Sequence, residues 1–141
     1  MSIPSIYIVD NDFISAFEIE IRIHQANVPC QVQTFDDVGD ALGIFETTFS
    51  SSDERPDIVL VSFDLPDMDG PFFLSQLKKF GVDFDHTDVY VFTAFGISER
   101  HEQSEELKDI RGVFRKPLSK QQVGGIFETY RERTGDGQVS A

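Results

Sequence analysis

The sequence predicts an α/β fold in which a parallel sheet is covered by helices on both faces. Five short apolar segments alternate along the chain with five predicted helices. This alternation is typical of parallel sheets, because two parallel strands are joined by a crossover that is long enough to hold a helix. Residues 58–61 are apolar without interruption, as expected for a central strand that is buried on both faces.

The first half of the chain contains two strand–helix units before the central strand. Residues 5–9 form the first predicted strand, and Asp12 or Asn11 is expected to cap a helix that ends near Ala26. Apolar residues and a histidine fall on one side of this helix: Phe13, Ile14, Phe17, Ile21 and His24. Residues 30–35 alternate as in a second strand, and another helix follows.

The second half of the chain contains three predicted helices and two strands. Residues 71–80 and the segment from 119 onward have apolar side chains at helical spacing. Between them, residues 88–92 and 111–115 are expected to be strands. Residues 98–109 are strongly polar, so we expect a helix that is exposed along most of its surface.

The length suits one domain, and the charge limits its partners. Domains typically contain about 100 to 200 residues, so we assign residues 1–133 to a single domain and residues 134–141 to a flexible tail. The chain has 12 Lys and Arg against 25 Asp and Glu, a net charge of -13. Nucleic acids and anionic membranes bind clustered Lys and Arg, so neither is an expected partner.

The sequence predicts a cytoplasmic protein. Cys30 is the only cysteine, which excludes an intrachain disulfide. No apolar stretch approaches the ~18 residues that a membrane helix requires. The N-terminus also lacks the basic region and apolar run of a secretory signal.

Four segments resemble the landmarks of response regulator receiver domains and occur in that family's order. They are IYIVDND at the first strand, VSFDLPDMDG at the central strand, VYVFTA at the fourth and VFRKP at the fifth. The resemblance covers nearly the whole chain and implies the flavodoxin-like (βα)5 fold, a doubly wound parallel sheet with strand order 2-1-3-4-5. It also implies a CheY-like signalling module of a two-component or phosphorelay pathway rather than an enzyme.

The resemblance also shows a departure at the position that accepts phosphate in the family. There an aspartate ends the central strand and attacks a phosphohistidine of a partner kinase, whereas this chain has Ser62. By position, Asp10 and Asn11 correspond to the paired acids that hold magnesium, and Thr93 and Lys116 correspond to the residues that contact the phosphoryl group. Serine cannot form an acyl phosphate, and its hydroxyl is a weak nucleophile without a neighbouring base. The chain is therefore interpreted as a pseudo-receiver.

Any magnesium binding is expected to be weak or lost, and no other cofactor is indicated. Magnesium is usually held through carboxylates, and Asn11 and Ser62 are neutral beside Asp10. Asp64 stands where the family gives a backbone carbonyl to the metal, and its carboxylate could partly restore the site or act as a displaced acceptor. In the structural alternative, the site has decayed and Lys116 pairs with Asp10 to compensate its buried charge.

We therefore predict a stand-alone receiver-like interaction module that works independently of phosphorylation. The alternative is an active phosphoacceptor that uses Asp64 or Ser62 in a rearranged, magnesium-dependent site. The expected partner is a histidine kinase, a phosphotransfer protein or an output protein. The sequence is also compatible with a homodimer. The contact surface would contain the fourth helix, fifth strand and fifth helix, where Val113 occupies a position that is usually aromatic in active receivers. A flavodoxin-like cofactor binder is disfavoured, because no phosphate-binding loop follows the first strand.

Overall fold

The computed structural model describes residues 3–51, 55–66 and 68–135, and it contains one five-stranded parallel sheet. The strands are β1 (Ser5–Val9), β2 (Gln31–Phe35), β3 (Ile58–Ser62), β4 (Asp88–Thr93) and β5 (Gly112–Arg115). Their order in the sheet is β2-β1-β3-β4-β5, and every neighbouring pair is parallel. The predicted fold class and strand order are therefore confirmed.

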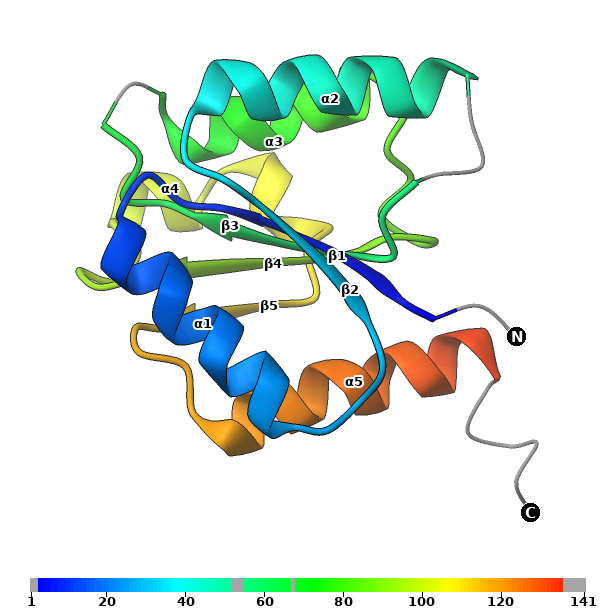
Figure 1. Ribbon diagram of the computed structural model, residues 1–141. Coiled ribbons are helices and arrows are strands. Elements are labelled where there is room, and N and C mark those ends of the chain that lie inside the picture. Colours follow the sequence, from blue (N-terminus) through cyan, green and yellow to red (C-terminus); the bar gives the residue numbers. More distant parts are fainter. Residues whose placement is uncertain (1–2, 52–54, 67, 136–141) are drawn as a thin grey trace.

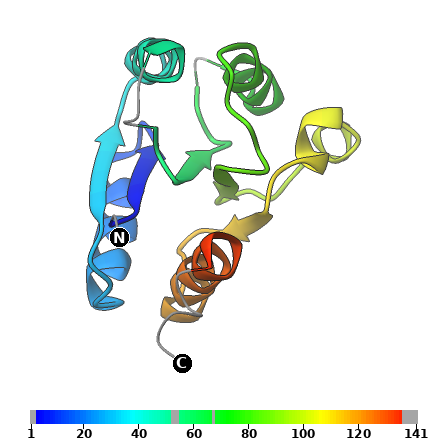
Figure 2. The ribbon, with the colours of Figure 1, turned by 90° about the vertical axis from the view of Figure 1, so that its right-hand side faces the viewer.

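Helices cover both faces of this sheet. They are α1 (Phe13–Gln25), α2 (Val38–Ser51), α3 (Gly70–Lys79), α4 (Glu99–Glu102) and α5 (Lys120–Thr134), with a 3-10 helix η1 (Glu105–Lys108). α2 and α3 lie on one face, and α1 and α5 lie on the other (Figure 1). Figure 2 shows α4 and η1, in yellow, beside the end of the sheet that β5 forms.

The sheet separates two apolar cores. Successive side chains of the central strand β3 point to opposite faces. Val59 and Val61 belong to the core under α2 and α3, whereas Ile58 and Leu60 belong to the core under α1 and α5. All four are buried, which explains why this segment is apolar without interruption.

The polar segment 98–109 does not form the single helix that we predicted. It contains α4 and η1, two one-turn pieces that are separated at Gln103 and Ser104. Neither piece has a buried residue, and only Leu107 and Ile110 pack partly against a core. Helices in proteins are stabilised mainly by packing of an apolar face, and this segment has too few apolar residues to support a continuous one.

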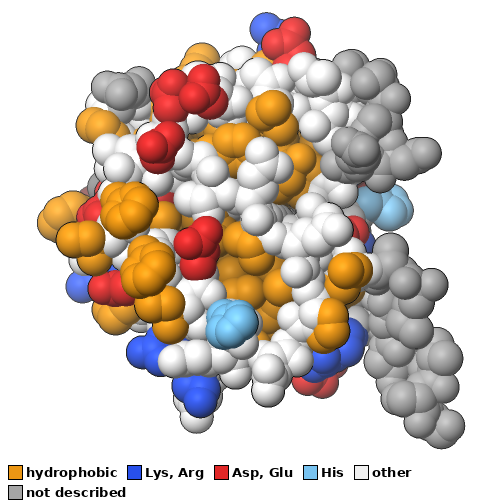
Figure 3. Space-filling model, in the orientation of Figure 1, with side chains coloured by type: hydrophobic (Ala, Val, Ile, Leu, Met, Phe, Trp, Pro, Cys, Tyr) orange, Lys and Arg blue, Asp and Glu red, His pale blue; other side chains and the backbone are white. Residues whose placement is uncertain are grey.

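Helix α1 turns an unexpected side toward the sheet. Its buried residues are Ala16, Ile19 and Ile23. The side predicted from the spacing is exposed and contains Phe13, Ile14, Phe17, Ile21 and His24. Figure 3 shows hydrophobic side chains, mixed with acidic ones, on the part of the surface where α1 lies.

Two helix starts are capped as the sequence suggests. Of the two candidates before α1, Asp12 is the cap, and its carboxylate accepts hydrogen bonds from two backbone N–H groups of the first turn. Ser119 caps α5 in a reciprocal capping box with Gln122.

The C-terminal helix is longer than expected. Thr134, assigned above to the tail, is the last residue of α5, and Gly135 ends the helix with a left-handed φ of 77°. Residues 136–141 of the predicted tail lie outside the described residues.

In the described ranges, no helix is long and apolar enough to cross a membrane.

Candidate functional site

The polar residues that the sequence singled out come from the carboxyl ends of four strands. Val61 pairs in register with Val91, and Thr93 pairs with Arg115, so the ends of β3, β4 and β5 meet at one edge of the sheet. β1 ends at the same edge, because Val9 pairs with Val61. This parallel register brings together side chains that are far apart in the sequence: Asp10, Ser62, Asp64, Thr93 and Lys116.

Ser62 is the last residue of β3 and is fully buried. Its Oγ accepts a hydrogen bond from the backbone N–H of Asp64 at 3.1 Å. Among the described residues, this is the hydroxyl's only hydrogen-bond partner. No imidazole or carboxylate of those residues is bonded to Ser62 to take its proton, so the hydroxyl is not activated as a nucleophile.

Asp64 is the most highly connected side chain at this edge. Thr93 Oγ1 donates to its Oδ1 at 2.6 Å, and the backbone N–H of Ala94 donates to its Oδ2 at 2.8 Å. Lys116 Nζ lies 3.2 Å from the same Oδ2. One carboxylate therefore joins the segments that follow β3, β4 and β5.

These contacts keep the carboxylate of Asp64 ionised. Partial burial raises the pKa of Asp64, but the hydrogen bonds from Ala94 and Thr93 and the charge of Lys116 outweigh it. The net effect is a pKa below the ordinary value of an aspartate. A carboxylate with a lowered pKa is a weak base and a strong hydrogen-bond acceptor at neutral pH.

Lys116 lies between two carboxylates. Besides Asp64, its Nζ lies 3.4 Å from Oδ2 of Asp10, whose side chain is completely buried. The other oxygen of Asp10 accepts a hydrogen bond from the backbone N–H of Asp12 at 3.0 Å. Among the described residues Oδ2 makes no hydrogen bond, and its partner there is the ammonium of Lys116.

The donor set fits a magnesium ion poorly. Both oxygens of Asp64 are engaged by protein donors, and the ammonium of Lys116 lies next to the one oxygen of Asp10 that makes no hydrogen bond. Asn11, the third position that the resemblance assigns to the metal, is exposed. Within ranges 3–51, 55–66 and 68–135, no three His, Cys, Asp or Glu residues are grouped so that they could hold a metal ion.

Sequence reasoning missed the partners of two loop aspartates. It treated Asp64 as a residue whose carboxylate would have to swing into the pocket, but it did not predict the bonds to Thr93 and Ala94. It did not predict the contacts of Asp69 either, whose Oδ1 lies 2.8 Å from His101 and 3.2 Å from Arg100. The only indication in the sequence was that α4 has basic residues and the loop before α3 has acidic ones. Their positions along the chain do not show that the two segments are in contact.

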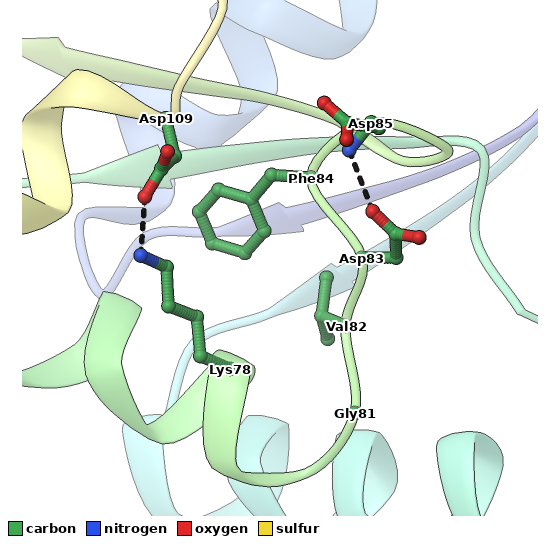
Figure 4. A pocket seen from close by; sticks show the side chains of 7 residues that line it. All are labelled: Lys78, Gly81, Val82, Asp83, Phe84, Asp85 and Asp109. Atoms are coloured by element: carbon green, nitrogen blue, oxygen red, sulfur yellow. Dashed lines mark hydrogen bonds and ion pairs between the residues drawn. The ribbon is translucent and has the colours of Figure 1, made fainter.

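A separate hollow of about 440 Å³ lies at the opposite edge of the sheet, between the end of α3 and the start of β4 (Figure 4). Its cation, Lys78, pairs with Asp109, and Asp83 accepts a hydrogen bond from the backbone N–H of Asp85 at 2.9 Å. Phe84 points toward Lys78 between these polar groups. The residues that line this hollow thus satisfy one another and do not form a reactive cluster.

The comparisons with known proteins agree with this architecture. A receiver domain protein from Methanospirillum hungatei has 19% sequence identity and a TM-score of 0.75, covering 96% of this chain and 99% of that one. A two-component response regulator from Cytophaga hutchinsonii has 16% identity and a TM-score of 0.80, with 94% and 99% covered. The signal receiver domain of a LuxO repressor protein from Vibrio parahaemolyticus has 17% identity and a TM-score of 0.75, with 99% of each chain covered.

At these identities the solved structures show a shared fold. None of the curated proteins compared with the chain matches it. The family assignment comes from the model described as response regulator receiver domain, which matches residues 6–126. Those residues run from β1 into α5 and contain every side chain of the candidate site. The chain therefore belongs to the response regulator receiver domain family.

Proposed function

We propose that this receiver domain is an interaction module of two-component signalling that works without being phosphorylated. The proposal rests on the identity of residue 62. It is a serine, at the position where the receiver family has its acceptor aspartate. Ser62 is fully buried, and its Oγ is occupied by the backbone N–H of Asp64. A group in this setting cannot form an acyl phosphate.

The surroundings of Ser62 also disfavour a serine phosphate. Attack by a hydroxyl requires a base that takes its proton. The neighbouring carboxylate of Asp64 is committed to Thr93, Ala94 and Lys116, and its lowered pKa makes it a poor base. Catalysis of phosphoryl transfer further requires positive charge around the transferred group, whereas the one ammonium here already serves two carboxylates.

The proposed partner surface contains α4, β5 and α5. α4 has no buried residue, and Val113 on β5 is 44% exposed. Phe114 faces the other way and stacks on Tyr90, with ring centroids 5.4 Å apart. The aromatic side chain at this point of β5 therefore belongs to the core and is not free to report the state of Thr93 to a partner.

The surface would serve a protein partner such as a histidine kinase, a phosphotransfer protein or an output protein. The net charge of -13 favours partners whose contact surface is basic. It also opposes a homodimer formed through acidic surfaces.

A second candidate function is phosphate acceptance by Asp64 itself. Its carboxylate lies within 2.6 Å of Thr93 Oγ1 and 3.2 Å of Lys116 Nζ, so it is close to both proposed phosphoryl-contact residues. In that case both oxygens would have to leave their donors before attack, and the transfer would depend on added magnesium.

Intact-mass measurement after incubation with acetyl phosphate and magnesium separates these functions. We expect no added phosphate on the natural protein, and added phosphate on a Ser62→Asp, Asp64→Ala double variant in which the acceptor is restored and its neighbourhood is cleared. The matched control is Ser62→Ala, Asp64→Ala, which should stay unlabelled. Phosphate on the natural protein would overturn the proposal. Its loss in Asp64→Asn would then identify Asp64 as the acceptor, and its loss in Ser62→Ala would identify Ser62.

A further inference from the structure

We propose that the carboxylate of Asp64 is a built-in ligand of the anion site formed by Thr93, Ala94 and Lys116. In this role it substitutes for a bound phosphoryl group and holds the loop after β4 in one arrangement. The inference rests on the proposed function, because it requires that no phosphate compete for the site, and it adds how the loop is regulated.

The three donors form a complete site for one anion. They are a hydroxyl, a backbone N–H and an ammonium, and they come from the ends of β4 and β5. All three converge on the two oxygens of Asp64 at 2.6 to 3.2 Å. Hydrogen bonds to an ionised acceptor are roughly twice as strong as those between neutral groups. A free oxyanion would have to displace Asp64 to reach these donors.

The carboxylate is held in place from its own backbone. The N–H of Asp64 donates to Oγ of Ser62, which ends the rigid strand β3. Ser62 and Asp64 thus act together. The serine removes the acceptor and accepts the N–H of the residue whose carboxylate occupies the anion site.

Asp64 also determines the shape of the loop that follows Thr93. A hydroxyl has one proton, and the Oγ1 of Thr93 lies nearest to Asp64, so its lone pairs are free to accept the N–H of Phe95 at 3.1 Å. The N–H of the preceding residue, Ala94, donates directly to the carboxylate of Asp64. The carboxylate of Asp64 therefore binds the amide of Ala94 directly and that of Phe95 through the hydroxyl of Thr93.

This loop carries a conspicuous surface feature. The side chain of Phe95 is 86% exposed, and Gly96 follows with a left-handed φ of 82°. A Cβ at Gly96 would lie 2.8 Å from the guanidinium of Arg115, so the loop passes close to β5. The carboxylate of Asp64 thereby presents Phe95 beside the proposed partner surface without any covalent modification.

The test measures amide hydrogen exchange by NMR in the natural protein and in an Asp64→Ala variant. We expect exchange at Ala94 and Phe95 to accelerate by about tenfold or more in the variant, because hydrogen bonds to a charged group are among the stronger ones. Asp64→Asn keeps the size of the side chain and should give an intermediate acceleration. Asp85→Ala is the matched control, since it removes one exposed carboxylate at the opposite edge of the sheet and should leave both amides unchanged.

Inorganic phosphate supplies the second arm of the same experiment. In Asp64→Ala, added phosphate should slow exchange at Ala94 again, while the natural protein shows no response at the same concentration. Unchanged exchange at both amides in Asp64→Ala and in Asp64→Asn would overturn the inference. So would equal phosphate responses of the natural protein and the variant. Either result leaves the proposed function to stand or fall by the acetyl phosphate labelling, which does not depend on loop exchange.

Discussion

Two clusters of charged side chains, each containing a buried aspartate, lie at opposite ends of the strands of the same sheet, and they balance their charges differently. At the start of β4, Asp88 is fully buried, and its Oδ1 accepts from Arg111 at 2.9 Å and from Arg133 at 2.8 Å. At the other edge, Asp10 and Asp64 share the single ammonium of Lys116. The first cluster has two cations for one carboxylate, and the second has one cation for two.

The first cluster joins distant elements of the fold, whereas the second lies at the carboxyl ends of the strands. Asp88 forms ion pairs with Arg111, just before β5, and with Arg133, near the end of α5. It therefore links three elements that are distant in the sequence. The cluster around Lys116 instead collects side chains from strand ends whose loops carry exposed residues.

The largest expected effect is at the cluster around Asp88. Asp88→Asn should lower the free energy of unfolding by about 3 kcal/mol, because it removes the fully buried anion that Arg111 and Arg133 share. Urea denaturation followed by circular dichroism measures the loss. Asp85→Asn, three residues earlier and exposed, is the control and should change little. Equal effects of the two variants would contradict the assignment of Asp88 as a structural centre.

A smaller loss is expected at the other edge. Lys116→Met should cost about 2 kcal/mol, because the ion pairs with Asp10 and Asp64 disappear while both carboxylates keep their hydrogen bonds from Asp12, Thr93 and Ala94. The side chain of Asp64 is 16% exposed, in contrast to the complete burial of the Asp88 side chain. Combining Lys116→Met with Asp64→Asn should recover part of the loss. A double variant less stable than Lys116→Met alone would contradict this account of the charges.

The smallest effect depends on pH. The folded-state pKa of Asp64 is lowered, so its contribution to stability is present above the unfolded pKa of about 3.9 and is lost as pH falls through the lower folded value. The groups that face it are the hydroxyl of Thr93, the N–H of Ala94 and the side chain of Lys116, which also pairs with Asp10. The stability difference between the natural protein and Asp64→Asn should therefore be constant near neutral pH and shrink below about pH 4. Urea denaturation across this range checks the prediction, and a difference that grows on acidification would contradict it.

The order of elements was predictable because it depends on local patterns. Apolar or alternating segments and helical spacing identified all five strands and most helices, and the parallel sheet followed from the order of strands and helices. The same logic placed Asp10, Ser62, Thr93 and Lys116 at one edge, since the carboxyl ends of parallel strands meet there. These conclusions needed no knowledge of which side chains touch.

The sequence was a weaker guide to helix orientation and helix length in two segments. In α1 apolar residues lie on several sides, and in segment 98–109 most residues are polar. α1 has apolar residues on several sides, so their spacing could not show that Ala16, Ile19 and Ile23 would face the sheet. The polar segment 98–109 has helix-forming residues but few apolar ones, and tertiary packing divided it into α4 and η1. Local spacing is a weak guide wherever the choice depends on a neighbouring element.

The sequence by itself determined the family, the fold and the presence of a serine at position 62, because these depend on residue identity and order along the chain. Only the tertiary structure decided where the carboxylate of Asp64 points. Its three donors are separated from it by 29, 30 and 52 positions and belong to segments that meet only when β3, β4 and β5 align. A hydrogen bond depends on distance and direction in space, and for these groups the folded sheet supplies both.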